Sequence, residues 1–181
     1  MKNFLSVLFL STLSFSALAF EPVRGPVIDI AGGYTPSILA IDGGISKSGY
    51  LGYKFNSFFS VEGGYTSLLT YSTSGPATLT SIAGPEVAGI IRFIINDRVS
   101  PFVRIGFTKM ALKNASNGTV TSIENIYGPT YGIGLQFYLV DHLGMRLGYT
   151  EYHLQTSSDY NAQAGTPVNT SNYYAALVIE F

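Results

Sequence analysis

The residues best suited to catalysis in this chain are its two histidines, His142 and His153. Glu151 lies two positions before His153, and Ser157 and Ser158 follow closely. A serine, an imidazole and a carboxylate together can activate a hydroxyl for acyl transfer. Glu151 and His153 would share one face of an extended strand, because side chains alternate between faces. This is the best candidate triad, but no His-x-Ser motif accompanies it, and we expect no enzymatic activity.

Charged residues set among apolar positions form a second group. Four are acidic and four are basic: Asp29, Glu62, Glu86, Glu180, Lys54, Arg92, Arg104 and Arg146. Their balanced signs suit a narrow interior, because an unpaired buried charge is costly. We expect ion pairs that fill this interior, with every member except Glu86 in a belt toward the turn ends of the strands. The alternative is a gate or narrow ion path formed by exchange of partners.

The N-terminus has the features of a secretory signal. A short basic start precedes an apolar stretch over 4–18, and Ala17 and Ala19 supply the small residues of a cleavage site. The apolar stretch is short for a membrane-spanning helix, which needs roughly 20 residues. We therefore expect a signal peptide at 1–19 and one mature domain at 20–181.

The composition excludes several classes of protein. Charged residues make up 12% of the chain, against roughly 25% in typical soluble domains. A net charge of −1 argues against a nucleic-acid partner. The chain has no cysteine, so neither a disulfide framework nor a lipid-modified N-terminal cysteine is expected. Neither metal-ligand spacing nor a phosphate-binding loop is present, so no metal ion and no cofactor is expected.

The chain beyond the signal repeats one pattern, about ten residues of alternating polarity and then a turn or loop. Strands are predicted at 26–36, 45–55, 59–69, 82–95, 101–112, 125–139, 143–154 and 171–181. Tight turns alternate with longer polar loops at 37–44, 70–81, 113–124 and 155–170. Pro85 and Pro129 would each lose a ladder hydrogen bond, so both are predicted to mark strand boundaries.

The alternation also indicates which solvent each face meets. The outward set is apolar and aromatic, as in Tyr131, Ile133 and Leu135, while the inward set mixes glycine, small polar and charged residues. A soluble barrel would reverse this arrangement. In hydrocarbon an unpaired backbone group costs several kcal/mol, so the sheet must close on itself. The sequence predicts an all-β protein, an eight-stranded antiparallel up-and-down transmembrane β-barrel.

Two segments, SVEGGY at 60–65 and MRLGY at 145–149, occur together with inward Arg92 and Arg104. They resemble the OmpA/OmpX-type eight-stranded barrels, which include opacity and Ail-like proteins. This resemblance implies a location in the bacterial outer membrane. One position departs from it: Gly148 stands where OmpA-type barrels can have an inward glutamate, so the pairing in the lumen must differ there.

The end of the chain carries the most specific element of the resemblance. Phe181 is terminal, Ile179 and Leu177 alternate behind it, and Tyr173 lies eight residues before the last. The pattern resembles the C-terminal signal by which the barrel-assembly machinery recognises its substrates. That machinery is therefore an expected partner.

We expect a structural and surface-interaction role, adhesin-like or opacity-like, in which the extracellular loops contact a host surface ligand. Outer-membrane lipid and lipopolysaccharide are further expected partners, and Lys47 and Lys109 are expected to contact lipopolysaccharide phosphates. Tyr71, Tyr127 and Tyr160 are candidates for ligand contact or for anchoring at the membrane interface. The alternatives are a narrow solute or ion pore and, less in keeping with the sequence, a lipid A-modifying enzyme.

Overall fold

The computed structural model describes residues 24–36, 43–72, 78–96, 98–116, 119–156 and 167–181. These residues form eight strands: β1 Gly25–Thr35, β2 Gly44–Lys54, β3 Phe59–Ser72, β4 Thr78–Arg92, β5 Val99–Ser116, β6 Thr119–Val140, β7 Leu143–Thr156 and β8 Pro167–Glu180. Among the described residues, no helix is long and apolar enough to cross a membrane. The signal peptide predicted at 1–19 lies outside the described residues.

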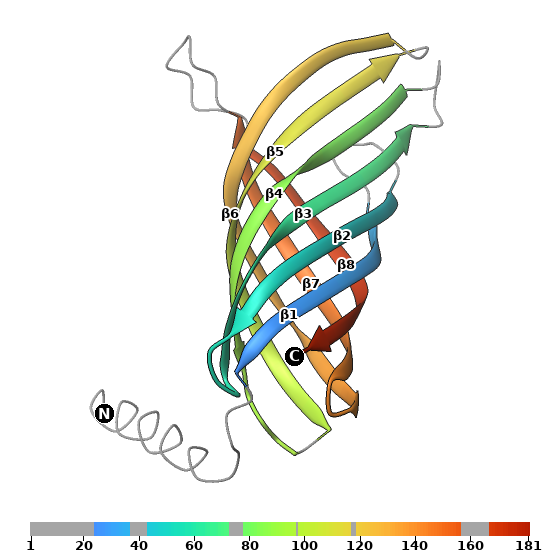
Figure 1. Cartoon of the computed structure of the whole chain (residues 1–181). Coiled ribbons are helices and arrows are strands. Elements are labelled where there is room, and N and C mark those ends of the chain that lie inside the picture. Colours follow the sequence, from blue (N-terminus) through green and yellow to red (C-terminus); the bar gives the residue numbers. More distant parts are fainter. Residues whose placement is uncertain (1–23, 37–42, 73–77, 97, 117–118, 157–166) are drawn as a thin grey trace, which may run out of the picture.

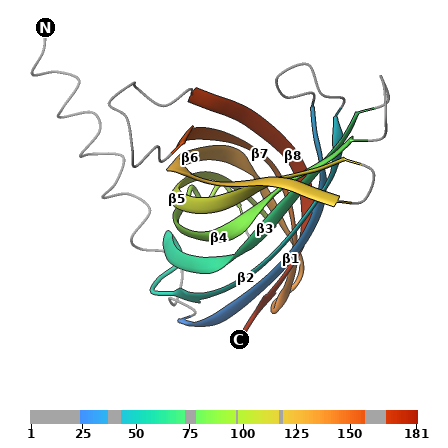
Figure 2. The ribbon, with the colours of Figure 1, turned by 90° about the horizontal axis from the view of Figure 1, so that it is seen from above.

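Each strand pairs antiparallel with the next along the chain, and β8 returns to pair with β1 (Figures 1 and 2). The closing ladder runs from Val27 opposite Glu180 to Tyr34 opposite Tyr173. The backbone NH of Phe181 extends this seam by donating to the carbonyl of Pro26 at 3.0 Å. The predicted eight-stranded up-and-down barrel is thus confirmed.

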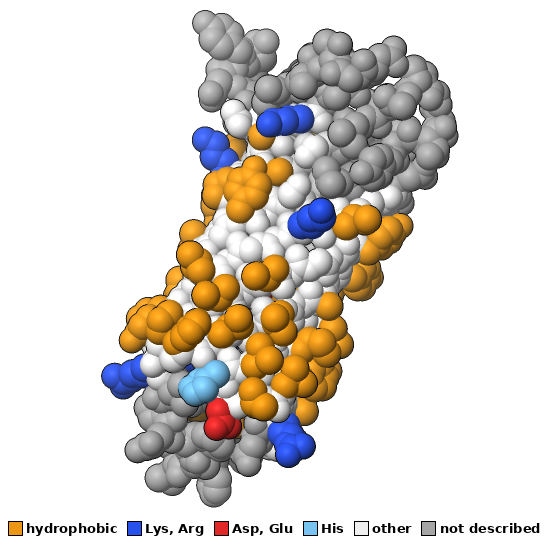
Figure 3. All heavy atoms as spheres, turned by 45° about the vertical axis from the view of Figure 1, so that its right-hand side comes forward, with side chains coloured by type: hydrophobic (Ala, Val, Ile, Leu, Met, Phe, Trp, Pro, Cys, Tyr) orange, Lys and Arg blue, Asp and Glu red, His pale blue; other side chains and the backbone are white. Residues whose placement is uncertain are grey.

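The outer wall is covered by apolar and aromatic side chains. Val87, Ile105 and Ile133 are each more than half exposed, at 60%, 53% and 62%. Their neighbours along each strand point into the barrel. Figure 3 shows hydrophobic side chains spread over much of the visible wall. Such a surface suits a wall surrounded by hydrocarbon.

At the end away from the tight turns, six strands, β3 to β8, extend further than the sequence predicts. β3 continues to Ser72, β5 to Ser116, and β6 begins at Thr119, so most of the loop predicted at 113–124 is strand. At its other end β4 stops at Arg92 rather than residue 95. The serine, threonine and asparagine residues of 113–124 suggested a loop. Ladder hydrogen bonds join backbone groups, however, so polar side chains do not end a strand whose neighbour also continues. Figure 1 shows β3 to β6 rising together at one end of the barrel.

The two prolines predicted as strand boundaries lie inside strands. Pro85 is within β4 and Pro129 within β6. The pairing of β4 with β5 is interrupted at 84–85, that of β6 with β7 at 128–129, and neither interruption shifts the register. The Thr108 hydroxyl donates to the carbonyl of Pro85 at 2.8 Å. A long ladder therefore tolerates a missing donor on one side when the pairing resumes on both sides of it.

Candidate functional site

The structure places all eight predicted charged residues in the lumen, where each is at most 6% exposed. They divide into two groups along the barrel axis. The lower network, near the tight turns, consists of Asp29, Lys54, Glu62, Arg92, Arg146 and Glu180 together with the uncharged Gln136. The central pair consists of Glu86 and Arg104. Each group contains equal numbers of acidic and basic side chains, so each is neutral by itself.

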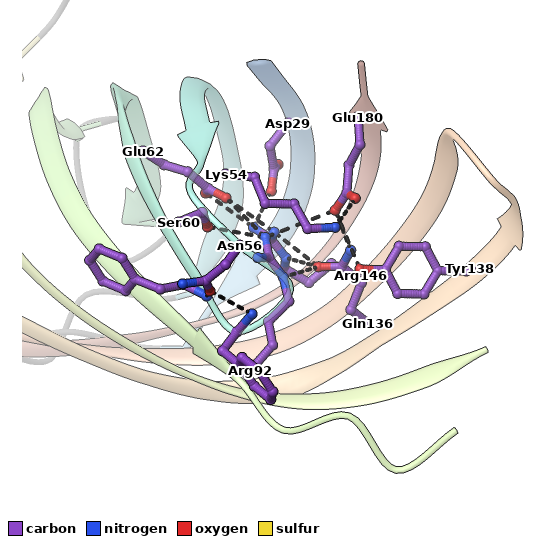
Figure 4. A network of polar contacts seen from close by, with 12 residues as sticks. Asp29, Lys54, Asn56, Ser60, Glu62, Arg92, Gln136, Tyr138, Arg146 and Glu180 are labelled. Carbon is purple, nitrogen blue, oxygen red and sulfur yellow. Dashed lines mark hydrogen bonds and ion pairs between the residues drawn. The ribbon is translucent and has the colours of Figure 1, made fainter. Parts of the chain in front are cut away.

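Arg146 on β7 is the centre of the lower network (Figure 4). Its two terminal nitrogens each donate to a different oxygen of Glu62 at 3.1 Å, and Nη1 also reaches Asp29 Oδ2 at 2.6 Å. The guanidinium lies 5.2 Å from the centre of the Phe102 ring. A fork of this kind is the geometry that arginine adopts with carboxylates, and it fixes both partners in direction as well as distance.

Gln136 on β6 connects the two sides of the lower network. Its carbonyl oxygen accepts from Arg146 Nη2 at 3.1 Å and from Arg92 Nε at 3.2 Å. Its amide nitrogen donates to Glu180 Oε1 at 3.0 Å, and Lys54 Nζ donates to Glu180 Oε2 at 2.5 Å. Gln136 is fully buried and was not among the residues predicted for the charge network. Its inward position among arginines was the available signal.

Arg92 is held between two carboxylates rather than by one of them. Its Nη2 atom lies 3.9 Å from Glu62 Oε1 and 4.0 Å from Glu180 Oε1. The same nitrogen donates to the Ser60 hydroxyl at 3.1 Å. Arg92 therefore contributes a balancing charge to the whole network and makes no fork of its own.

Arg104 does not join the lower network, although the sequence placed it there. Its Nη2 atom pairs with Glu86 Oε1 at 3.0 Å, and its guanidinium lies 4.3 Å from the centre of the Tyr50 ring. Glu86 also accepts hydrogen bonds from Tyr50 at 2.8 Å, Thr130 at 3.0 Å and Thr66 at 3.2 Å. The central pair is therefore enclosed by side chains from β2 to β6.

Above the central pair the β3–β7 side of the lumen becomes apolar, a change not expected from the sequence, while Ser46 of β2 and Thr170 of β8 keep the other side polar. Six side chains, each at most 2% exposed, form this apolar layer: Leu68, Ile82, Met110, Ile126, Tyr152 and Leu154. They come from β3 to β7, at the end where β3 to β6 rise. All six positions are an even number of residues from an inward polar residue on the same strand, such as Leu68 from Glu62 on β3. Continued alternation was thus the signal that could have found them.

The departure at Gly148 has a steric explanation. A Cβ atom on Gly148 would meet the ring of Tyr174, which faces it from β8. The space that an inward glutamate could occupy is filled by a tyrosine ring from the adjacent strand. The expected difference in lumen pairing is therefore an exchange of a charge for an aromatic ring.

Other predicted residues lie on the outer wall or outside the described residues. Lys47, Lys109 and Tyr127 are exposed. Tyr71 belongs to β3, and its side chain is not described. Tyr160 lies outside the described residues, as do two members of the candidate triad, the serines at 157 and 158.

The predicted assembly signal lies along the outward face of β8. Tyr173, Leu177 and Phe181 are exposed there, and Ile179 is half-buried. β8 pairs with β7 on one side and with β1 on the other. These side chains therefore project outward at the seam where the barrel closes.

Comparison with known proteins supports the architecture. The chain matches the family model of the outer membrane protein beta-barrel domain over residues 5–181. Among solved structures, Neisserial surface protein A is 16% identical with a TM-score of 0.67, and the match covers 86% of this chain and 96% of that one. The attachment invasion locus protein Ail of Yersinia pestis is 15% identical with a TM-score of 0.58, covering 89% and 100%.

The N-terminal β-barrel domain of Pseudomonas aeruginosa OprF is 12% identical with a TM-score of 0.55, covering 86% of this chain and 98% of that one. No curated protein sequence matches. At these identities the structural matches show the fold alone, whereas the family model spans almost the whole chain. The protein is located in the bacterial outer membrane, and the chain belongs to the outer membrane protein beta-barrel family.

Proposed function

We propose that the protein acts at the cell surface, attaching to a host surface component through the outer ends of its strands and the loops that join them. The observation that carries this proposal is the filled lumen. Arg146, Glu62 and Arg92 are at most 1% exposed in the lower network. The apolar layer fills the interior above them. A barrel filled in this way leaves its outer ends, and not its lumen, as the surface that a host component can contact.

The longest strands, β5 and β6, supply a surface for such contacts. β5 and β6 have 18 and 22 residues, against 11 in β1 and β2. Strands of about 9–11 residues are sufficient to cross a bilayer, so the β5–β6 hairpin extends beyond it. Its outer part is rich in threonine, serine and asparagine. The attachment role in the name of Ail, a protein of the same fold, points in the same direction.

The binding test uses the refolded protein in lipid vesicles with two probes, cultured epithelial cells and immobilised heparin. Heparin is included because a heparin analogue is present in one Ail structure. Four variants remove 38–41, 73–77 or 158–165, or shorten the β5–β6 hairpin by removing 113–122. At least one variant is expected to lose binding while it keeps the gel-mobility shift of a folded barrel on boiling. Unchanged binding by all four folded variants would refute the proposal.

The pore alternative is tested by planar-bilayer conductance. We expect the wild-type barrel to be nearly silent, because both the lower network and the apolar layer block the lumen. Removing Arg104 alone is expected to leave it silent, since the layers on either side stay in place. A sharp rise in conductance in Arg104→Ala would instead support a gated path. The enzyme alternative is tested by mass spectrometry of lipid A from cells with and without the protein.

Two partner proposals concern the wall itself. Lys47 on β2 and Lys109 on β5 point outward, where their ammonium groups can meet lipopolysaccharide phosphates. Replacing both by glutamine is expected to weaken retention of lipopolysaccharide by the purified barrel more than replacing exposed Lys113.

We also propose that the outward face of β8 is the assembly signal. Phe181→Ala is then expected to lower the amount of protein in the outer membrane without lowering its stability after refolding.

A further inference from the structure

A polar cluster interrupts the apolar outer wall on β7. Glu151 accepts a hydrogen bond from the Tyr149 hydroxyl at 2.7 Å through Oε1, and its other oxygen, Oε2, lies 3.4 Å from His153 Nε2. The Tyr131 ring, on β6, packs against the imidazole in a T-shaped arrangement, with 5.7 Å between centres. The side chains of Glu151 and His153 are 49% and 45% exposed. The site is open to its surroundings, and its carboxylate and its imidazole each contact a neighbouring tyrosine.

The position of the cluster makes a lone carboxylate unfavourable. Glu151 lies eight residues beyond Leu143, the first residue of β7. With a rise of about 2.3 Å per residue along a tilted strand, that is about 19 Å, near the edge of an apolar band roughly 25 Å tall. The outward positions of β6, β7 and β8 contain no lysine or arginine among the described residues. The carboxylate therefore has no strong cation on its own side of the wall.

The spacing of the two ligand atoms fits a metal ion. Zinc-type ions bind imidazole nitrogen and carboxylate oxygen at about 2.0–2.2 Å. Two such bonds that span the 3.4 Å between Nε2 and Oε2 enclose an angle of about 110°, close to the tetrahedral value. The two residues lie two positions apart on the same face of the strand, so no backbone change is needed to bring them together.

We propose that Glu151 and His153 form a surface site for a first-row divalent cation such as Zn²⁺ or Co²⁺. No group of three or more metal-ligating side chains occurs among the described residues. The protein therefore supplies two ligands, and the other coordination positions take water or a phosphate oxygen of a neighbouring lipid headgroup. Carboxylate, imidazole and phosphate oxygen are all accepted ligands for such ions.

The neighbouring tyrosines prepare this site. The Tyr149 hydroxyl holds Oε1 and leaves Oε2 to face His153. Tyr149 is itself packed against the Tyr173 ring of β8 at 4.9 Å between centres, and Tyr131 fixes the imidazole plane. Groups that orient metal ligands in this way commonly change affinity by about 10- to 100-fold when they are removed.

The experiment measures Co²⁺ binding to the untagged, refolded protein in detergent, by visible absorption, with Zn²⁺ competition as a second readout. We expect one saturable site in the wild type and its loss in His153→Ala and in Glu151→Gln. Tyr149→Phe is expected to weaken binding about tenfold. His142→Ala is the matched control, since it removes the only other histidine, in the turn before β7, and is expected to bind as the wild type does.

Equal binding by the wild type and His153→Ala, or no saturable binding by the wild type, would overturn the proposal. Loss of binding in His142→Ala with retention in His153→Ala would place the ion at the turn instead. A second arm adds vesicles with and without an anionic phospholipid. Tighter binding with the anionic lipid identifies a phosphate as the further ligand, and it is expected to disappear in Glu151→Gln. All variants are first checked for the mobility shift on boiling, which shows that the barrel is folded.

Discussion

The two halves of the lumen fill the same narrow space by different physics. The lower network uses charged side chains that are forked, bridged and directionally fixed, with Arg146 at its centre. The apolar layer uses six side chains, of which all but Tyr152 lack a hydroxyl or a charge, and it depends mainly on close packing. The central pair of Glu86 and Arg104 lies between them and is surrounded by hydroxyl groups. Both halves are filled, so they differ instead in how much stability a substitution removes.

The contrast predicts how each half responds to damage. A missing charge in the lower network leaves its partner buried and unpaired, and the penalty for that is electrostatic. A missing methyl group in the apolar layer leaves a small cavity, and the penalty scales with its size. The chain has no tryptophan. Stability is therefore best followed by urea unfolding in lipid vesicles with circular dichroism and the gel shift on boiling.

The largest effect is expected from Arg146→Met, which removes the charge shared by Asp29 and Glu62 and leaves both carboxylates buried. Breaking a buried pair in this way costs about 3–5 kcal/mol. The measurement is the free energy of unfolding in urea.

The matched control is the double variant Arg146→Met, Asp29→Asn, which removes one charge of each sign and leaves the lower network neutral, with Glu62 still 3.9 Å from Arg92. It is expected to be more stable than Arg146→Met alone, because amides are cheaper to bury than carboxylates. A double variant less stable than the single one would show that the lower network stabilises through more than charge balance.

The apolar layer is expected to give the next largest effect. Leu68→Ala opens a cavity among Ile82, Met110 and Ile126 and is expected to cost about 3 kcal/mol in the free energy of unfolding. Ile82→Val, in the same layer, removes one methylene group and is expected to cost about 1 kcal/mol. A result in which the two variants cost the same would mean that this layer relaxes around the gap. It would then not be packed as the structure shows.

Hydrogen bonds to the central pair are expected to contribute less. Tyr50→Phe removes the hydroxyl that donates to Glu86 at 2.8 Å but keeps the ring under Arg104. A hydrogen bond to an ionised group is worth about 1.5–3 kcal/mol, so a loss of about 2 kcal/mol is expected. The control is Tyr53→Phe on the same strand, whose ring is exposed on the outer wall. A cost as large for the control would attribute the effect to the membrane interface and not to the lumen.

The sequence predicted the wall and the lower network better than the upper end. Strand side chains have a period of two, so the inward positions of Glu62, Arg104 and Arg146 follow from alternation once eight strands are recognised. Partner choice does not follow from it. Arg104 pairs with Glu86 and packs on the Tyr50 ring, and both contacts depend on the register between strands.

The upper end was harder to predict for two physical reasons. Its outer strand residues are polar, as in the loop predicted at 113–124, yet backbone pairing continues through them. Its inward residues, such as Leu68 and Leu154, are apolar and look like wall residues when their parity is not counted. Pro85 and Pro129 added false boundaries. Composition was therefore a poor guide at this end, where the outward residues become polar and the inward residues become apolar.

The smallest effect is expected from salt, and it tests whether the upper half shields the lower. Salt screens exposed charges over about 10 Å at 0.1 M but acts much less on buried pairs. Glu62, Arg92 and Arg146 are at most 1% exposed, so the free energy of unfolding is expected to change by less than about 0.5 kcal/mol between low and high salt, as for surface changes generally.

The informative variant is Leu68→Ala, which opens the apolar layer without touching a charge. If that layer keeps water and ions from the charges below, the free energy of unfolding becomes salt-dependent in this variant alone. Tyr53→Phe, on the wall, is then expected to be as insensitive to salt as the wild type. A salt dependence already present in the wild type would mean that water reaches the lower network from the turn end, past Lys54, which is 6% exposed. In that case the two halves would be independent barriers, because opening one would not change the screening of the other.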